Sequence, residues 1–190
     1  MEQAREKQNL RKATIEKREA IGKDEFESKS ESIRNNIFLL PEWQRADIVY
    51  TYVSMRNEPD TIQVINRALD EGKKVCVPKI FGKEMRFIPI GSVDDLKKGT
   101  WGILEPDDKG IYETKPGFML VPGILFGEDF NRIGYGAGYY DRYFAGCRNE
   151  DGWFLAAVAY DFQIRPEIPR EEFDIYMDAI VTNDRVLRRK

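Results

Sequence analysis

The chain of 190 residues contains no histidine. This absence excludes Ser-His-Asp and Cys-His nucleophile systems, and it also excludes histidine-ligated metals. Any proton or metal chemistry must therefore use aspartate, glutamate, lysine, tyrosine or the substrate itself.

Cysteine is scarce as well, with Cys76 and Cys147 as the two cysteines of the chain. Two cysteines cannot form a structural zinc site unaided, and a disulfide framework is not expected inside the cytosol. Cys76 stands between Val75 and Val77, an apolar strand-like setting in which a free cysteine usually acts as a small buried hydrophobe.

Long apolar runs and an excess of positive charge are also missing. No stretch approaches the ~20 apolar residues of a membrane span, and the N-terminus lacks the apolar segment of a signal peptide. The formal net charge is −3, whereas a general nucleic-acid binder usually carries a basic excess. We therefore expect a cytoplasmic protein with no membrane or nucleic-acid partner, formed by one domain over residues 1–190 and acting as a monomer.

Strand and helix patterns alternate along the chain. Helices are expected over residues 2–20 and 24–39, with Pro41 ending the second helix. Strands are expected over residues 47–53, 74–78, 84–90, 118–121, 153–160 and 179–182. This alternation predicts a three-layer α/β/α sandwich with a mostly parallel, mixed central sheet of the Rossmann-like type.

The first two of these strands are joined by a helix. It begins near Pro59 and carries Ile62, Ile65 and Leu69 on one face. The unit is therefore β-α-β, with parallel strands and a right-handed crossover. Further on, we expect a short helical turn at 93–98 and a loop at 99–117, and a loop of that length is often functional.

The stretch from Asn131 to Arg142 reads Asn-Arg-Ile-Gly-Tyr-Gly-Ala-Gly-Tyr-Tyr-Asp-Arg. Every second residue from 134 to 138 is glycine, so the backbone can approach a ligand closely or turn through φ > 0. A helix is expected from Tyr139, and a glycine-rich turn before a helix N-terminus is a site for phosphate. The alternative is a surface turn with aromatic side chains beneath it. The spacing matches neither the dinucleotide fingerprint nor the P-loop, which disfavours a Rossmann-type dehydrogenase.

The residues around this loop favour a nucleotide site. Arg132 can hold a phosphate bidentately, and Asp141 can hold a magnesium ion that also contacts phosphate oxygens. Tyr139 and Tyr140 can stack on a planar ligand.

The first helix carries a second cationic feature. On a period of 3.6 residues, Lys7, Arg11 and Arg18 fall within a narrow arc of one face. This arc is either a solvated charged face or a cationic arm that folds back over a triphosphate, and the spacing leaves both open.

In order and spacing, four segments resemble those of the 5-formyltetrahydrofolate cyclo-ligase family, whose members are also called methenyltetrahydrofolate synthetases. They are residues 7–11, 52–58, 121–123 and 131–142, and the similarity extends from about residue 3 to residue 184. The resemblance implies that ATP and magnesium drive the conversion of 5-formyltetrahydrofolate, with or without a polyglutamate tail, into 5,10-methenyltetrahydrofolate. ADP and phosphate are released.

The resemblance also implies roles for individual residues. ATP would be bound by Lys7, Arg11, Arg132, Gly134, Tyr135, Gly136, Ala137, Gly138, Tyr139 and Tyr140. Magnesium would be held by Asp141 and Asp174, and the catalytic residues would be Arg132, Tyr140 and Asp141. Folate would be bound by Val53, Met55, Glu58, Trp101 and Tyr140. Ala137 stands where many members of the family have glycine.

Several alternatives remain at this stage. Trp101 is also compatible with a core aromatic, Glu58 with a charge at a helix N-terminus, and Asp174 with a turn or cap. For the whole chain, the alternative is a non-catalytic protein that binds a nucleotide or a folate.

Overall fold

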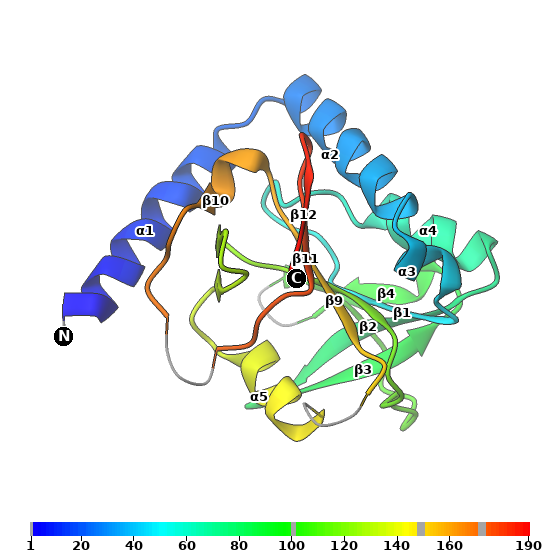
Figure 1. The fold of residues 1–190 in the computed structure, drawn as a ribbon. Coiled ribbons are helices and arrows are strands. Elements are labelled where there is room, and N and C mark those ends of the chain that lie inside the picture. Colours follow the sequence, from blue (N-terminus) through cyan, green and yellow to red (C-terminus); the bar gives the residue numbers. More distant parts are fainter. Residues whose placement is uncertain (1, 100–101, 148–150, 171–173) are drawn as a thin grey trace.

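The computed structural model describes residues 2–99, 102–147, 151–170 and 174–190, and Figure 1 shows how they are arranged. A central sheet lies between helices. The helices are α1 (Glu2–Glu19), α2 (Lys23–Phe38), α3 (Pro41–Arg45), α4 (Ile62–Asp70) and α5 (Tyr139–Cys147), with the 3₁₀ turns η1 (Val93–Asp95) and η3 (Asp161–Gln163).

Seven strands form the central sheet in the order β12-β11-β9-β6-β1-β2-β3. The inner strands pair in parallel, whereas β12 and β3 pair antiparallel at the two edges. Their bounds are β1 (Ile48–Thr51), β2 (Lys74–Phe81), β3 (Glu84–Ile90), β6 (Phe118–Val121), β9 (Phe154–Val158), β11 (Ala179–Val181) and β12 (Val186–Arg188). The sheet is therefore mostly parallel and mixed, as the sequence predicts.

The two faces of the sheet have separate cores, because successive side chains of a strand point to opposite faces. Val49 of β1 pairs with Val75 and Phe118, and all three lie in the core that α2, α3 and α4 cover. The next residue, Tyr50, pairs with Cys76, and both lie in the core on the other face, which α5 covers.

Few residues anchor the first helical layer. They are the buried side chains Ile33 and Ile37 of α2, Trp43 of α3, and Val64, Ile65 and Ala68 of α4. Helix α2 ends at Phe38, and Leu40 is extended, as is usual for the residue before a proline. Pro41 also begins α3 at the first helical position, where a missing N–H costs nothing.

The opposite face carries α5, α1 and a small sheet of order β10-β7-β8. Leu10 and Ile15 of α1 pack against Ile124, Leu125 and Ile133, in or next to this small sheet. Its strands are β7 (Leu125–Gly127), β8 (Arg132–Ile133) and β10 (Ile164–Arg165), and a separate pair is formed by β4 (Leu96–Lys98) and β5 (Leu104–Pro106).

The predicted three-layer architecture is confirmed, with a second outer layer that mixes helices and short strands. The strands β4, β5, β7, β8, β10 and β12 were not predicted, because two or three residues carry no alternating pattern. One of them, β5, lies inside the segment predicted as a loop at 99–117. Within the described ranges, no helix is long and apolar enough to cross a membrane.

The core beneath α3 gives a test of the fold. Trp43 is 1% exposed and meets Phe118 of the sheet edge-on, with 5.7 Å between ring centroids. We expect Trp43→Ala to lower the free energy of unfolding by about 3–5 kcal/mol, because it leaves a cavity. Urea denaturation measures this loss. Leu39→Ala is the control, since Leu39 is 73% exposed and should change stability by less than about 0.5 kcal/mol; equal losses would contradict the packing.

Candidate functional site

A pocket of about 550 Å³ lies at the carboxyl ends of β1 and β6. From β1 the chain continues to β2 and β3 on one side, and then crosses to β6 on the other side of β1. Ligands of open α/β sheets bind at such a reversal of strand order. Tyr52 and Val53 line the pocket just after β1, and Pro122 lines it just after β6.

The pocket brings together residues that are far apart in the sequence. Most of the site residues predicted from the sequence line this pocket. They are Lys7, Arg11, Val53, Met55, Glu58, Arg132, Gly134, Tyr135, Gly136, Ala137, Gly138, Tyr139, Tyr140, Asp141 and Asp174. Trp101, predicted to contact folate, lies outside the described residues.

Sequence reasoning missed other lining residues. They are Tyr52, Arg56, Pro78, Ile80, Met85, Ile103, Glu105, Pro122 and Ile133. Ile103 and Glu105 belong to the long segment at 99–117, whose length was the available signal. The residues from β2 and β3 read as ordinary strand positions, so no sequence signal distinguished them.

The glycine loop joins β8 to α5. Gly136 and Gly138 have φ values of 99° and 66°, which a side chain rarely tolerates. Gly134 is needed for space, since a Cβ there would lie 2.9 Å from Nη1 of Arg132. Within the described part of the chain, the backbone N–H groups of residues 134–138 donate no hydrogen bond. They are therefore available to an anionic ligand next to the N-terminus of α5.

Arg132 and Asp141 form an ion pair beside this loop. Arg132 Nη2 donates to Asp141 Oδ1 at 2.6 Å, and the Arg132 side chain is 5% exposed. Its Nε and the hydroxyl of Tyr140 are both buried without a hydrogen-bond partner among the described residues. The guanidinium lies 5.5 Å from the centre of the Tyr140 ring, and burial raises the pKa of Tyr140 well above its ordinary value. These two polar groups are therefore available to a ligand or to a water molecule.

Helix α1 supplies cations to the same end of the pocket. Arg11 Nε donates to the carbonyl oxygen of Gly134 at 2.8 Å, so it braces the loop. Lys7 Nζ lies 3.8 Å from Asp174 Oδ2. Asp178, by contrast, accepts from the backbone N–H of Leu155 at 2.8 Å and serves the sheet.

The acidic residues of the pocket suit a metal that completes its coordination from elsewhere. Asp141 and Asp174 both line the pocket. Within the described ranges, no three Asp, Glu or Cys side chains gather closely enough to hold a metal by themselves. Magnesium commonly takes one or two carboxylates and fills its remaining positions with phosphate oxygens and water.

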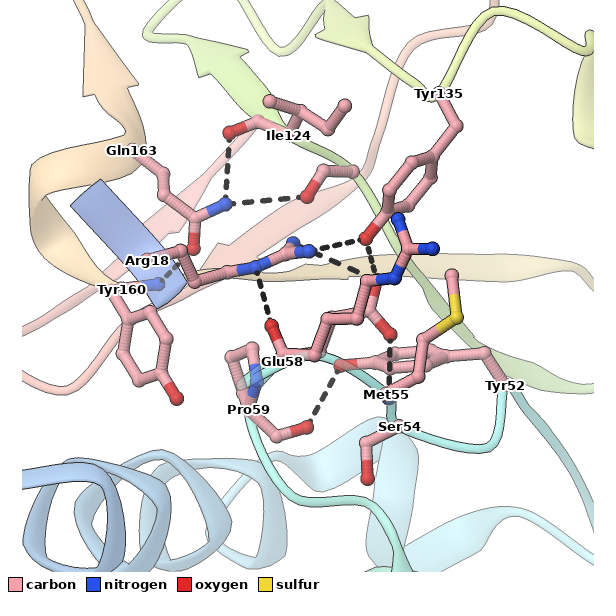
Figure 2. Close-up of polar contacts among 12 residues, drawn as sticks. Arg18, Tyr52, Ser54, Met55, Glu58, Pro59, Ile124, Tyr135, Tyr160 and Gln163 are labelled. Atoms are coloured by element: carbon pink, nitrogen blue, oxygen red, sulfur yellow. Dashed lines mark hydrogen bonds and ion pairs between the residues drawn. The ribbon is translucent and has the colours of Figure 1, made fainter. Parts of the chain in front are cut away.

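The other end of the pocket is organised by a buried ion pair, which Figure 2 shows. Arg18 is 1% exposed, and its Nη1 lies 3.7 Å from Glu58 Oε1. The hydroxyl of Tyr135 donates to the same Glu58 oxygen at 2.5 Å, and Arg18 Nη2 donates to that hydroxyl at 2.5 Å. Glu58 Oε2 accepts from the backbone N–H of Met55 at 3.1 Å. Helix α1, the glycine loop and the chain after β1 therefore meet at one carboxylate.

The turn that carries Glu58 has a strained backbone, and hydrogen bonds with α1 hold it in place. Arg56 and Asn57 have φ values of 47° and 54°, in the left-handed region. The Glu58 N–H donates to the Met55 carbonyl at 2.8 Å and closes the turn. Arg18 Nε donates to the Arg56 carbonyl, and the Asn57 amide donates to carbonyl oxygens at the C-terminal end of α1.

The structure excludes a solvated charged face on α1, whereas the predicted contact of Lys7 and Arg11 with a triphosphate stays a prediction. Lys7 and Arg18 are buried, so the face is not solvated. Lys7 and Arg11 lie at the glycine-loop end, but Arg18 pairs with Glu58 and is not part of a phosphate-binding arm. Tyr135, predicted to contact ATP, likewise directs its hydroxyl to Glu58.

Burial dominates the electrostatics of Glu58. Desolvation raises the pKa of its carboxyl, and the attraction of Arg18 and the hydrogen bond from Tyr135 offset this only in part. Desolvation also raises the pKa of Tyr135 well above its ordinary value, so its hydroxyl is a donor at neutral pH.

Comparison with known proteins places these residues in a family context. The sequence model of the 5-formyltetrahydrofolate cyclo-ligase family matches residues 3–183. A protein of Schizosaccharomyces pombe named "Probable 5-formyltetrahydrofolate cyclo-ligase" is 32% identical over 179 residues, which cover 86% of this chain and 88% of that protein. The mouse 5-formyltetrahydrofolate cyclo-ligase is 27% identical over 190 residues, which cover 94% of each chain.

The fold is also similar to that of a solved structure. The NMR structure of the 5,10-methenyltetrahydrofolate synthetase of Aquifex aeolicus superposes with a TM-score of 0.83 at 33% sequence identity. The match covers 96% of this chain and 92% of that one.

The raised pKa of Glu58 predicts a pH dependence of stability. The folded protein holds the Glu58 proton more tightly than the unfolded chain, whose carboxyl has the ordinary pKa of 4.5. The stabilisation from this proton is complete below that value and is lost as pH rises through the folded pKa. We expect the free energy of unfolding of the wild type to fall over this interval relative to Glu58→Gln, as measured by urea denaturation at successive pH values.

Glu113→Gln is a control for which the stability should change with pH in the opposite direction. The hydrogen bond from Lys74 lowers the pKa of Glu113, so its stabilisation is present above the ordinary pKa and is lost as pH falls. Parallel curves for the wild type and Glu58→Gln between about pH 4 and pH 7 would contradict the burial cost assigned to Glu58.

Proposed function

Because the chain belongs to the 5-formyltetrahydrofolate cyclo-ligase family, we propose that it uses ATP and magnesium to convert 5-formyltetrahydrofolate into 5,10-methenyltetrahydrofolate. ADP and phosphate are the other products. The observation that carries this proposal is a single pocket with two unlike ends. One end has unpaired N–H groups and cations for phosphates, and the other has apolar walls and buried carboxylates for a fused ring.

The reaction needs activation of a poor leaving group. The formyl oxygen is amide-like, so the terminal phosphoryl group of ATP is transferred to it and ADP leaves. The folate nitrogen at position 10 then attacks the activated formyl carbon and gives up its proton to the phosphate or to water, and the carbon–oxygen bond breaks to release phosphate. Positioning and charge neutralisation accelerate both steps. A chain without histidine is suited to such chemistry.

The glycine-loop end is the proposed phosphate site. The N–H groups of residues 134–138 and the unpartnered Nε of Arg132 are oriented donors in a partly buried setting. Lys7 and Arg11 add positive charge from α1. Arg132 is the residue best placed to stabilise the charge of the transferred phosphoryl group, because its guanidinium is already buried and held by Asp141.

Asp141 and Asp174 are the proposed magnesium ligands. The fit rests on oxygen donors that line the same pocket as the phosphate site. Each carboxylate is neutralised in the structure by a cation, Arg132 or Lys7, and in a complex those cations would turn to phosphate oxygens. When bound, magnesium would neutralise and align the phosphate oxygens of ATP.

The opposite end is the proposed folate site. Val53, Met55 and Tyr140 form its walls, and Glu58 accepts a hydrogen bond from a ring N–H. We propose that the monomer is the active unit. We propose a cytoplasmic location, although one similar protein, from Arabidopsis thaliana, is named as mitochondrial.

The overall activity is tested by a change in absorbance. With ATP, magnesium and 5-formyltetrahydrofolate, the purified protein is expected to produce the near-UV band of the methenyl product. Chelation of magnesium should abolish the signal, and added magnesium should restore it. Binding of both ligands without product would instead support a non-catalytic binding protein.

The metal assignment is tested at Asp141. Loss of even an outer-shell partner of a metal costs roughly 10- to 100-fold in affinity. We therefore expect Asp141→Asn to raise the magnesium concentration for half-maximal rate by at least about 10-fold, with the KM for folate unchanged. Steady-state kinetics at varied magnesium measures this.

Asp161→Asn is the matched control for this variant. Asp161 is 38% exposed and pairs with Arg185, much as Asp141 is 37% exposed and pairs with Arg132, but Asp161 lies outside the pocket lining. The control should keep the wild-type magnesium dependence. An unchanged dependence in Asp141→Asn would rule out its role as a ligand.

A further inference from the structure

Two buried glutamates line the pocket, and their surroundings differ. Glu58 is 4% exposed and Glu105 is 5% exposed. Glu58 already meets Arg18, the Tyr135 hydroxyl and the Met55 N–H. Glu105 has an ion pair with Lys79, at 3.7 Å between Oε2 and Nζ, and accepts no hydrogen bond from any described residue. Glu105 therefore has acceptor capacity that the described residues leave unused.

Lys79 balances the charge of Glu105 without donating a hydrogen bond to its carboxylate. The ammonium group donates to the carbonyl oxygen of Pro106 at 2.8 Å, whereas its contact with Glu105 is longer than a hydrogen bond. Gly99 lies so close that a Cβ at that position would collide with the Glu105 carboxylate. The carboxylate is thus accommodated by a glycine on one side and neutralised by a lysine on the other.

Apolar side chains line the same pocket as Glu105. Pro78 and Ile80 flank Lys79 on β2 and lie on the other face of that strand, and Met85 of β3 pairs with Ile80. Ile103 precedes β5, the strand of Glu105, and all four side chains line the pocket. A planar ring gains by burial against such side chains, and a carboxylate in the same pocket can bond to N–H groups on the ring's edge.

We propose that Glu105 binds the aminopyrimidinone edge of the folate ring, accepting hydrogen bonds from the ring N3–H and the 2-amino group. These two donors are adjacent and parallel, so they match the two oxygens of one carboxylate, as a guanidinium does. This inference rests on the proposed function, because it takes folate as the ligand. Glu105 is then the residue that selects a pterin over a ring without the amino group, and Glu58 serves a different N–H of the substrate.

The test compares two ligands and two proteins. The ligands are 5-formyltetrahydrofolate and its 2-desamino-2-methyl analogue, which lacks the amino donor, and calorimetry measures their binding without ATP. We expect the wild type to bind the analogue about 10- to 100-fold more weakly, as is typical for loss of a hydrogen bond to a charged group. In Glu105→Gln, the natural folate should bind about 10-fold or more weakly, and the discrimination should fall below about 3-fold. The KM for ATP should not change.

Glu113→Gln is the matched control. Glu113 also pairs with a lysine and its side chain is 11% exposed, but it lies outside the pocket lining. It should keep wild-type affinities and wild-type discrimination. The two wild-type titrations need no variant, so the proposal stays testable even if Glu105→Gln folds poorly.

The outcomes separate this inference from the proposed function. Equal binding of both ligands by the wild type, or undiminished discrimination in Glu105→Gln, overturns the role of Glu105 and leaves the enzyme assignment intact. Failure of the wild type both to bind 5-formyltetrahydrofolate and to form methenyl product overturns the proposed function itself, and this inference with it.

Discussion

The buried ion pair between Arg18 and Glu58 is the interaction on which the pocket depends. Removing two charges from water is costly, and the cost is offset only where further hydrogen bonds complete the pair. The Tyr135 hydroxyl and the Met55 N–H supply those bonds. The pair therefore ties together helix α1, the turn after β1 and the glycine loop, which are separated in the sequence by up to 117 residues. Breaking such a pair from one side costs roughly 3–5 kcal/mol, because the remaining charge stays buried.

The same organisation divides the pocket by chemistry. Near the N-terminus of α5, each acidic side chain has a cation beside it, as in Arg132–Asp141 and Lys7–Asp174. Under the proposed function, a polyphosphate with its metal would exchange partners within these pairs without leaving a buried charge uncompensated. At the other end, burial raises the pKa of Glu58, so a substrate N–H that bonds to the carboxylate helps to keep it ionised. Under the proposed function, a ligand at either end would thus supply a charge or a hydrogen bond that the protein alone does not provide.

The sequence predicted local features well. The glycine spacing from 131 to 142 and the apolar strands are patterns within about ten residues, and the structure has a loop, a helix and a parallel sheet there. Lys7 and Arg11 were singled out because helical periodicity places them on one face. The same periodicity included Arg18 and could not distinguish it, since the partner of each cation is decided by segments elsewhere in the chain. Apart from the length of the segment 99–117, no sequence signal indicated Glu105, because its place in the pocket depends on β2 and on a two-stranded pairing too short to predict.

The sequence by itself therefore determined the α/β architecture, the absence of histidine chemistry, and the family to which the chain belongs. Only the tertiary structure decided which charges are buried together. Arg18 with Glu58 and Lys79 with Glu105 are contacts between separate elements. Periodicity records which face of an element is apolar, but ion pairs follow from how the faces of different elements meet. That is a property of packing and not of any local pattern.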